Sequence, residues 1–292
     1  MKYLKILLPI SILSLVFVID YYNKYYKPNT SFEDESIFLY VMEDDSLAFK
    51  DSISKYIKSE KTFYKVAERL EYLQNKKTGR FKIAKDIGNN DIVNSLKFNN
   101  TPINVTFNNQ ERVENLAGRV SKQIYEDSTS LLSAFRDKKF LEDNNLNEQN
   151  VLSIFIPNSY NIYWNSTPED FRDRMLAEYN KFWNKDRSEK AKKLGLTKLE
   201  VISLASIVQI ESRRNDERPR VAGLYINRLK KNMRLQADPT VIYTIKDYYK
   251  NFDTIIRRVL YRDLKLESEF NTYRIFGLPP GPITMPDISA ID

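Results

Sequence analysis

The chain of 292 residues is long enough for one large domain or two small ones, and its 42% hydrophobic and 29% charged residues are typical of folded proteins. It has no cysteine, no histidine and no glycine-rich phosphate motif, which excludes thiolate nucleophiles, histidine-based triads, His- or Cys-ligated metals and P-loop or dinucleotide sites. The formal net charge is +7, but 46 basic residues are interspersed with 39 acidic ones, so we expect no nucleic-acid partner and look for chemistry on carboxylates.

The first 26 residues predict a membrane anchor. An apolar run at residues 6–19 follows Lys2 and Lys5. The run is short for a spanning helix of roughly 17–25 residues, but the tyrosines behind it can form an interfacial belt. A cleaved signal peptide is the alternative, which the large residues after the run disfavour. The lysines place the amino end in the cytoplasm, so we expect a single-pass protein of the inner membrane with its remaining residues outside the cytoplasm.

A short strand, a polar turn and an amphipathic helix recur loosely three times after a polar linker at residues 27–36. We expect strands at residues 37–41, 80–84 and 103–107, turns that include residues 42–46, and helices at residues 47–57, 61–74, 91–96 and 112–124. This mixed order predicts an α+β fold rather than a doubly wound sheet.

The second half carries stronger helix signals. Residues 168–184 begin with a proline after two candidate caps, which favours a helix. Thr197, with Glu200 three residues on, forms a capping box in front of a helix that runs through Ser212. A further helix is expected at residues 221–231.

Glu211 occupies the apolar stripe of the helix that Thr197 caps. It follows Leu204 by seven residues and Ile207 by four, so it projects from the apolar face. A carboxyl group there loses hydration, which favours its protonated form, the state that a general acid needs. Two structural alternatives remain at this point: a buried salt bridge with a nearby arginine, and a helix-end side chain that reaches solvent.

Polar residues cluster further along the chain. Gln236, Asp238 and Thr240 interrupt an apolar run, the arrangement of a site that orients a polar ligand. Residues 271–273 precede a stiff loop at residues 277–282, whose glycines and prolines alone would indicate only a structural turn.

Taken together, these segments resemble the endolytic murein transglycosylases, the YceG-like family. The resemblance is carried by several motifs in the same order, at residues 155–158, 204–212, 217–219, 221–229, 235–243 and 271–282. The strand–turn–helix units are similar to the LysM-like subdomain of that family. The resemblance implies a LysM-like subdomain at residues 37–100 and an α+β lytic transglycosylase domain at residues 101–292.

The resemblance implies an enzyme that cuts MurNAc–GlcNAc bonds within peptidoglycan glycan strands and leaves 1,6-anhydro-MurNAc ends, terminating the elongation of nascent strands. One glutamic acid donates and then accepts the proton, so no second carboxylate, metal or cofactor is expected. Carried over, Glu211 is catalytic. The candidates for holding sugar hydroxyls are Ser212, Gln236, Asp238, Asn271 and Tyr273.

The chain departs from the family pattern in two places. Many relatives carry a second acid where Gln209 stands, and relatives continue past the loop at 277–282 with a helix and a strand, whereas this chain stops at Asp292. The expected partners are glycan strands, the membrane and peptidoglycan synthases. A non-catalytic, membrane-anchored peptidoglycan-binding protein is the main alternative, and a hydrolase with Asp216, Glu217 or Asp238 as base is another.

Overall fold

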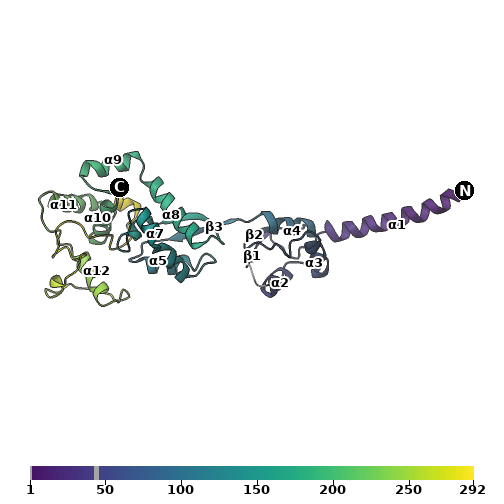
Figure 1. Ribbon diagram of the computed structural model, residues 1–292, viewed down its shortest axis with the longest axis horizontal. Coiled ribbons are helices and arrows are strands. Elements are labelled where there is room, and N and C mark those ends of the chain that lie inside the picture. The colour runs from purple at the N-terminus through teal and green to yellow at the C-terminus, as the bar shows by residue number, and fades with distance from the viewer. Residues whose placement is uncertain (1, 43–45) are drawn as a thin grey trace. The chain divides into compact units, whose positions relative to one another are not determined.

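The computed structural model describes residues 2–42 and 46–292, and the chain forms two compact units (Figure 1). Unit 1 comprises Met1–Ile103 and Asn161–Asn165, and unit 2 comprises Asn104–Tyr160 and Ser166–Asp292. Strand β3 (Pro102–Phe107) pairs with strand β4 (Asn158–Tyr163). The boundary between the units falls inside both strands, so the chain crosses from one unit to the other there. Each unit is therefore considered by itself.

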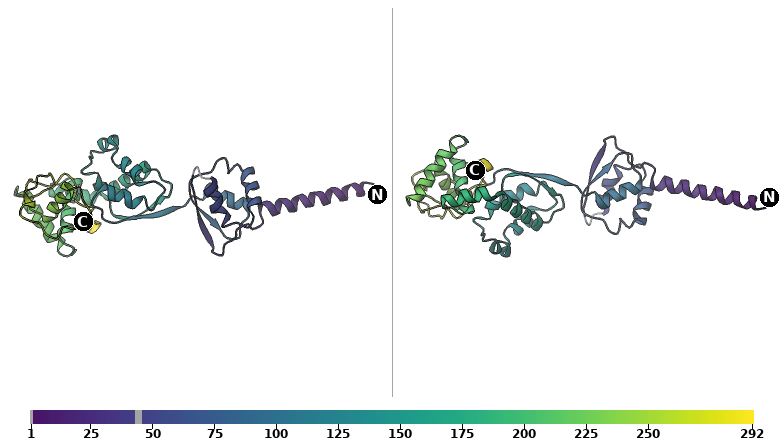
Figure 2. Two further views of the ribbon diagram at one scale, coloured as in Figure 1. Left: turned by 90° about the horizontal axis from the view of Figure 1, so that it is seen from below. Right: turned by 90° about the horizontal axis from the view of Figure 1, so that it is seen from above.

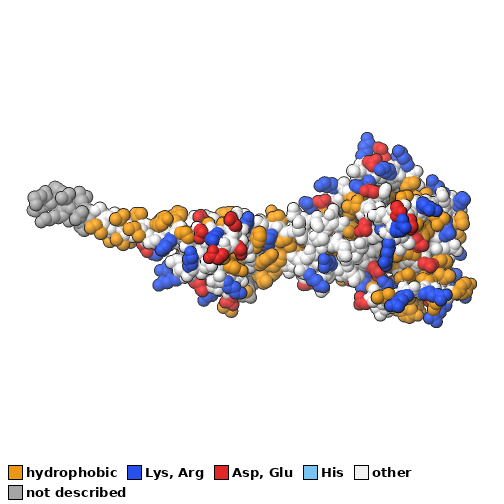
Figure 3. All heavy atoms as spheres, turned by 180° about the vertical axis from the view of Figure 1, so that it is seen from behind, with side chains coloured by type: hydrophobic (Ala, Val, Ile, Leu, Met, Phe, Trp, Pro, Cys, Tyr) orange, Lys and Arg blue, Asp and Glu red, His pale blue; other side chains and the backbone are white. Residues whose placement is uncertain are grey.

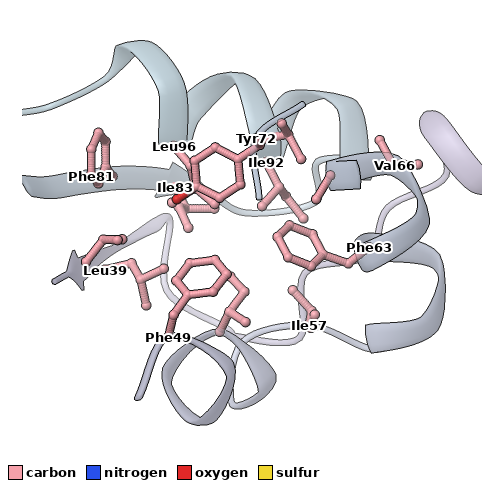
Figure 4. Close-up of a cluster of buried hydrophobic side chains, with 14 residues drawn as sticks. Leu39, Phe49, Ile57, Phe63, Val66, Tyr72, Phe81, Ile83, Ile92 and Leu96 are labelled. Atoms are coloured by element: carbon pink, nitrogen blue, oxygen red, sulfur yellow. The ribbon is translucent and has the colours of Figure 1, made fainter. Parts of the chain in front are cut away.

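Unit 1 is built on a two-stranded antiparallel sheet. Strand β1 (Ser36–Val41) pairs with β2 (Gly79–Ala84) in a register that places Leu39 opposite Phe81. Alternate residues of both strands are buried, as the period of two requires for a sheet with one covered face. The covering helices are α2 (Ser46–Ser54), α3 (Glu60–Arg69) and α4 (Asn89–Phe98). Figure 4 shows how side chains such as Leu39, Phe49, Phe63, Phe81 and Ile92 meet in this core.

The stretch expected to be a linker, residues 27–36, lies within unit 1. Asn29 is buried, and its side-chain amide donates a 2.6 Å hydrogen bond to the side-chain oxygen of Asn89 at the start of α4. Pro28 forms an isolated bridge with Gly88, where a Cβ atom would come within 2.6 Å of the Tyr25 carbonyl oxygen. A glycine is needed there because only a bare Cα allows this approach of two backbone segments.

Helix α1 (Lys2–Tyr25) contacts α3 and α4 and runs outward from them, as the two views of Figure 2 show. The apolar side chains of residues 10, 12, 13 and 15–19 are 50–66% exposed. Among residues 2–42 and 46–292, no helix combines the length and the apolar character needed to cross a bilayer. The predicted membrane anchor is therefore not supported, because the apolar run at residues 6–19 falls short of the roughly 20 residues that a span requires.

Unit 2 is mostly helical. Its first helices are α5 (Val113–Val120), α6 (Ser128–Phe135), α7 (Lys138–Asp143) and the 3-10 helix η1 (Val151–Ile154). After β4 come α8 (Pro168–Phe182), α9 (Lys185–Leu194), α10 (Lys198–Glu211), α11 (Arg218–Lys230), α12 (Asp238–Tyr248), the 3-10 helix η2 (Asp263–Lys265) and α13 (Ile288–Ile291).

Helix α10 is the central element of unit 2. It packs against α9, α11, α12, α13 and η1, and its residues 202–209 are all buried. The capping box is present as expected: the Thr197 hydroxyl accepts from the Glu200 backbone N–H, and the Glu200 carboxylate accepts from the Thr197 N–H. A locally fixed start and an apolar body together explain why this helix forms the core.

The α+β class is confirmed, but the three expected strand–helix units do not share one sheet. The strands expected at 37–41, 80–84 and 103–107 exist as β1, β2 and β3 within one residue at their starts. However, β3 pairs with β4 instead of β1 or β2, and β4 had no predicted counterpart. Of the expected turn at 42–46, residues 43–45 lie outside the described residues.

Candidate active site

Glu211 is the last residue of α10. The buried stretch of the helix ends at Gln209, and both Ile210 and Glu211 are exposed. The expected desolvation of Glu211 is therefore wrong, because the helix leaves the core one residue before the carboxylate. The solvent-reaching alternative is the one that the structure supports, and it leaves Glu211 open to a ligand that arrives from solution.

Tyr225 of α11 lies close to this carboxylate. The tyrosine is 3% exposed, within a cluster of apolar residues that includes Leu204 and Val208 of α10. Burial raises the pKa of Tyr225 well above its ordinary value, and the negative charge of Glu211 acts in the same direction. The phenol thus stays protonated at neutral pH, close to the Glu211 carboxylate.

A second tyrosine–carboxylate pair joins the start of α12 to the chain after η2. The Tyr273 hydroxyl donates a 2.7 Å hydrogen bond to Oδ1 of Asp238. Burial raises the pKa of Tyr273 to about 12, helped by this bond and by the charges of Asp238 and Glu211. Asp238 is the first residue of α12, where the helix dipole favours a negative charge.

The two pairs belong to one cluster. The charges of Glu211 and Asp238 both raise the pKa of Tyr225 and of Tyr273, while the charge of Arg228 lowers both. Such coupling requires the groups to lie within a short distance of one another. We call Glu211, Tyr225, Arg228, Asp238 and Tyr273 the carboxylate–tyrosine cluster. It gathers side chains from α10, α11, α12 and the loop after η2.

Arg228 is oriented by the backbone. Its guanidinium donates to the carbonyl oxygen of Leu235, on the segment that leads into α12. The arginine therefore links α11 to that segment, and its positive charge lowers the pKa of both Tyr225 and Tyr273.

Asn271 lies inside the protein and shapes the loop that carries Tyr273. It is fully buried; its amide donates to the carbonyl oxygens of Leu264 (3.2 Å) and Leu266 (2.7 Å), and its oxygen accepts from the Tyr273 N–H (3.0 Å). The next residue, Thr272, bonds the Thr240 hydroxyl at 2.8 Å. The placement of Asn271 favours a role in positioning Tyr273 rather than contact with a sugar.

The remaining two predicted residues differ in exposure. Gln236 is exposed, has a left-handed backbone (φ 50°), and its N–H donates to the Thr272 carbonyl oxygen at 3.1 Å, so its side chain is directed by a fixed backbone. Ser212 is buried, and its hydroxyl donates to the Glu217 carboxylate at 3.0 Å and accepts from the Arg214 N–H at 3.2 Å. Ser212 thus shapes the turn after α10.

The glycine- and proline-rich loop docks on the rest of unit 2. Gly277 has a left-handed backbone (φ 82°), and a Cβ on Gly281 would lie 1.9 Å from the Gln149 carbonyl oxygen. Just after the loop, the Ile283 N–H donates to the buried hydroxyl of Ser206 on α10 at 3.1 Å. The loop is thereby tied to the helix that presents Glu211.

Sequence reasoning did not single out Tyr225 or Arg228, although both lie in the family motif at residues 221–229. Taken alone, Tyr225 resembles one more apolar position of α11. Gln209, which stands where many relatives carry an acid, is 9% exposed and accepts from the Asp287 N–H at 2.6 Å, so it holds the chain end against α10. Among the described residues, no group of three or more Asp or Glu side chains is arranged to bind a metal ion.

Comparison with known proteins matches this architecture to one family. The model of the YceG-like family matches residues 47–292. The endolytic murein transglycosylase of Bacillus subtilis (strain 168) is 38% identical over 123 residues, which are 42% of this chain and 32% of that protein. That of Streptococcus pneumoniae serotype 2 (strain D39) is 31% identical over 136 residues, 47% of this chain and 24% of that protein.

A solved structure supports the fold. The crystal structure of a YceG-like protein from Listeria monocytogenes superposes with a TM-score of 0.54 and 22% sequence identity, covering 89% of each chain. The aligned part of this chain spans a third or less of the two transglycosylases. Because the family model covers residues 47–292, the chain belongs to the YceG-like family.

Proposed function

We propose that this protein is an endolytic peptidoglycan lytic transglycosylase in which Glu211 is the catalytic acid and base. The observation that carries the proposal is the exposed carboxylate of Glu211 at the end of a buried helix, close to the buried, protonated phenol of Tyr225. The names of the Bacillus and Streptococcus relatives support the same substrate and reaction.

In the proposed reaction, protonated Glu211 gives its proton to the glycosidic oxygen as the bond to the anomeric carbon of MurNAc breaks. The GlcNAc residue leaves with a free 4-hydroxyl group. The Glu211 carboxylate then takes the proton of the MurNAc 6-hydroxyl while that oxygen bonds to the anomeric carbon, which closes the 1,6-anhydro ring. No water is consumed and Glu211 ends protonated, so one carboxylate serves both steps.

The neighbouring groups fit supporting roles. Tyr225 holds the carboxylate in one orientation, which counts because a catalytic proton must move over hydrogen-bond distance. The negative charge of Asp238 favours the positive charge that develops on the sugar ring as the bond breaks. Gln236, Asp238 and Tyr273 are the proposed contacts to sugar hydroxyls, and Ser212 and Asn271 are the proposed supports of the flanking loops.

The substrate sets the location and the partners. Glycan strands lie outside the cytoplasmic membrane, so we place unit 2 on that side. Unit 1 is proposed to bind glycan as a LysM-like subdomain. Nascent strands beside peptidoglycan synthases are the proposed substrate. Equal cleavage of mature, crosslinked sacculi would count against that preference.

The test compares the full chain with Glu211→Gln on purified, uncrosslinked glycan strands, with the products read by mass spectrometry. Glu189→Gln on α9 is the matched control, because it makes the same change at an exposed acid. We expect 1,6-anhydro-MurNAc ends from the parent and the control and none from Glu211→Gln. Reducing MurNAc ends that carry oxygen from labelled water would indicate a hydrolase instead. Bound but uncut strands in all three samples would indicate a peptidoglycan-binding protein.

A further inference from the structure

The segment at residues 254–262, between α12 and η2, exposes apolar side chains. Residues 254–260 form neither helix nor strand. Ile255 is 82% exposed, Tyr261 77% and Leu260 40%. Exposed apolar side chains are common singly, but a group of large ones on one short segment is typical of a docking surface.

The same segment is strongly basic. It contains Arg257, Arg258 and Arg262 and no acid, and the nearest acids in the sequence are Asp253 and Asp263. The Arg262 side chain is 83% exposed, with its Nε 3.8 Å from Asp263, and Arg257 and Arg258 are exposed. A weak ion pair of this kind leaves most of the positive charge available to a partner.

The backbone of the segment is held only at its ends. Leu260 N–H donates to the Asp263 carboxylate at 2.8 Å, and Asp253 N–H donates to the Asn251 side chain at 3.2 Å. Among the described residues, none from 254 to 259 takes part in a backbone hydrogen bond with another. The segment can therefore adapt to a surface without breaking internal structure.

Aromatic residues extend this surface. Tyr248 and Tyr249, at the end of α12, are 63% and 69% exposed, and α12 packs against η2. Figure 3 shows hydrophobic and basic side chains side by side on the part of unit 2 that carries α12. Protein surfaces that lie in a membrane interface typically combine basic, aliphatic and aromatic side chains in this way.

We propose that the 254–262 segment, together with Tyr248 and Tyr249, docks on a membrane surface of anionic phospholipids. The three arginines bind lipid phosphates, and Ile255 and Tyr261 enter the boundary between headgroups and acyl chains. A lipid surface is favoured over a soluble anionic polymer because only the lipid offers an apolar layer to these two side chains. This contact is separate from the carboxylate–tyrosine cluster and adds a second interaction to the proposed function.

The test is amide hydrogen exchange of the full chain, read by mass spectrometry on peptides that cover residues 252–262. Vesicles of phosphatidylglycerol and phosphatidylcholine are compared with vesicles of phosphatidylcholine alone. Exchange is expected to be fast in the free protein and to slow by about 10-fold with the anionic vesicles, and about 0.5 M salt should reverse the effect. A local readout is needed because the exposed apolar side chains of α1 can bind vesicles independently.

The double variant Arg257→Gln, Arg258→Gln should lose most of the protection. Lys192→Gln, Lys193→Gln on α9 removes the same charge from exposed positions and should keep it. Ile255→Ser with Tyr261→Ser should weaken protection even at low salt. Unchanged circular dichroism of each variant shows that its fold is intact.

Three results would overturn the proposal. They are no slowing with anionic vesicles, equal slowing with neutral vesicles, and equal slowing with soluble polyphosphate, which would point to an anionic polymer instead. Glu211→Gln should respond to the vesicles like the parent. Failure of the lipid response therefore leaves the proposed glycan cleavage standing, and loss of cleavage leaves the lipid response standing.

Discussion

The Tyr273 hydroxyl bonds the Asp238 carboxylate at 2.7 Å and so connects the loop after η2 to the first residue of α12. Asn271, two residues before Tyr273, fixes the backbone from which that hydroxyl projects. The Asp238–Tyr273 pair lies within electrostatic range of Glu211 and Arg228. Changes at either residue should therefore reach the proposed chemistry.

Removing the Tyr273 hydroxyl should affect activity more than stability. For Tyr273→Phe we expect about a 10-fold fall in kcat/KM for glycan strands, because Asp238 loses the donor that orients it. The free energy of unfolding should change by only about 1 kcal/mol, the net value of one hydrogen bond. Tyr249→Phe, at an exposed tyrosine that directly follows α12, is the control and should change neither quantity in solution. Equal kcat/KM for both variants would remove Tyr273 from the site.

Alanine variants of Asn271 and Gln236 should distinguish a residue that supports the fold from one that contacts the ligand. Asn271→Ala leaves the carbonyl oxygens of Leu264 and Leu266 without their hydrogen-bond donor, so we expect a loss of about 2 kcal/mol in the free energy of unfolding. Gln236→Ala truncates an exposed side chain and should leave that free energy within about 0.5 kcal/mol while raising KM. Urea unfolding and steady-state kinetics test both variants. A stable Asn271→Ala protein would contradict the internal role.

Gly281 and Gly223 have contrasting surroundings, so replacing each with alanine should change the stability of the protein in opposite directions. At Gly281 a Cβ would meet the Gln149 carbonyl oxygen at 1.9 Å, so Gly281→Ala must displace the loop and should cost about 2 kcal/mol or more. At Gly223, within α11, a Cβ meets no atom within 4 Å, and Gly223→Ala should stabilise the protein by up to about 1 kcal/mol. Thermal unfolding of the two variants measures the difference. Similar melting temperatures would argue against the tight loop contact.

Alkaline pH should destabilise unit 2. Burial raises the pKa of Tyr160, Tyr179 and Tyr273 to about 12 from the ordinary value of 10.0. A raised pKa means that the folded state favours the protonated phenol, so this stabilisation is complete below pH 10 and is lost as the pH rises from 10 to 12. Phenolate absorbance measures tyrosine ionisation and circular dichroism measures unfolding, and both can be followed between pH 8 and about 12. Ionisation of every tyrosine near pH 10, with the fold intact, would contradict the burial.

Local patterns in the sequence were sufficient to predict several elements. The capping box at Thr197 and Glu200 predicts the start of α10 because both partners lie within one helical turn. Alternating apolar residues predict β1, β2 and β3 for the same reason, since a period of two is a property of the strand itself. Family motifs then indicated Glu211, Asp238 and Tyr273, which the structure places in one cluster.

The features that the sequence did not predict depend on contacts between segments that are distant in the sequence. The exposure of Glu211 is decided by where the neighbours of α10 end, and helical periodicity alone assigned it to the buried face. Tyr225 gains its role only because α11 packs beside α10. Asn271 is taken up by internal hydrogen bonds that no local pattern reveals. The sequence by itself predicted several helices, three strands and Glu211 as the candidate acid, whereas tertiary packing decided which polar groups face solvent and which are held by internal hydrogen bonds, because burial and hydrogen-bond partners arise only when distant segments meet.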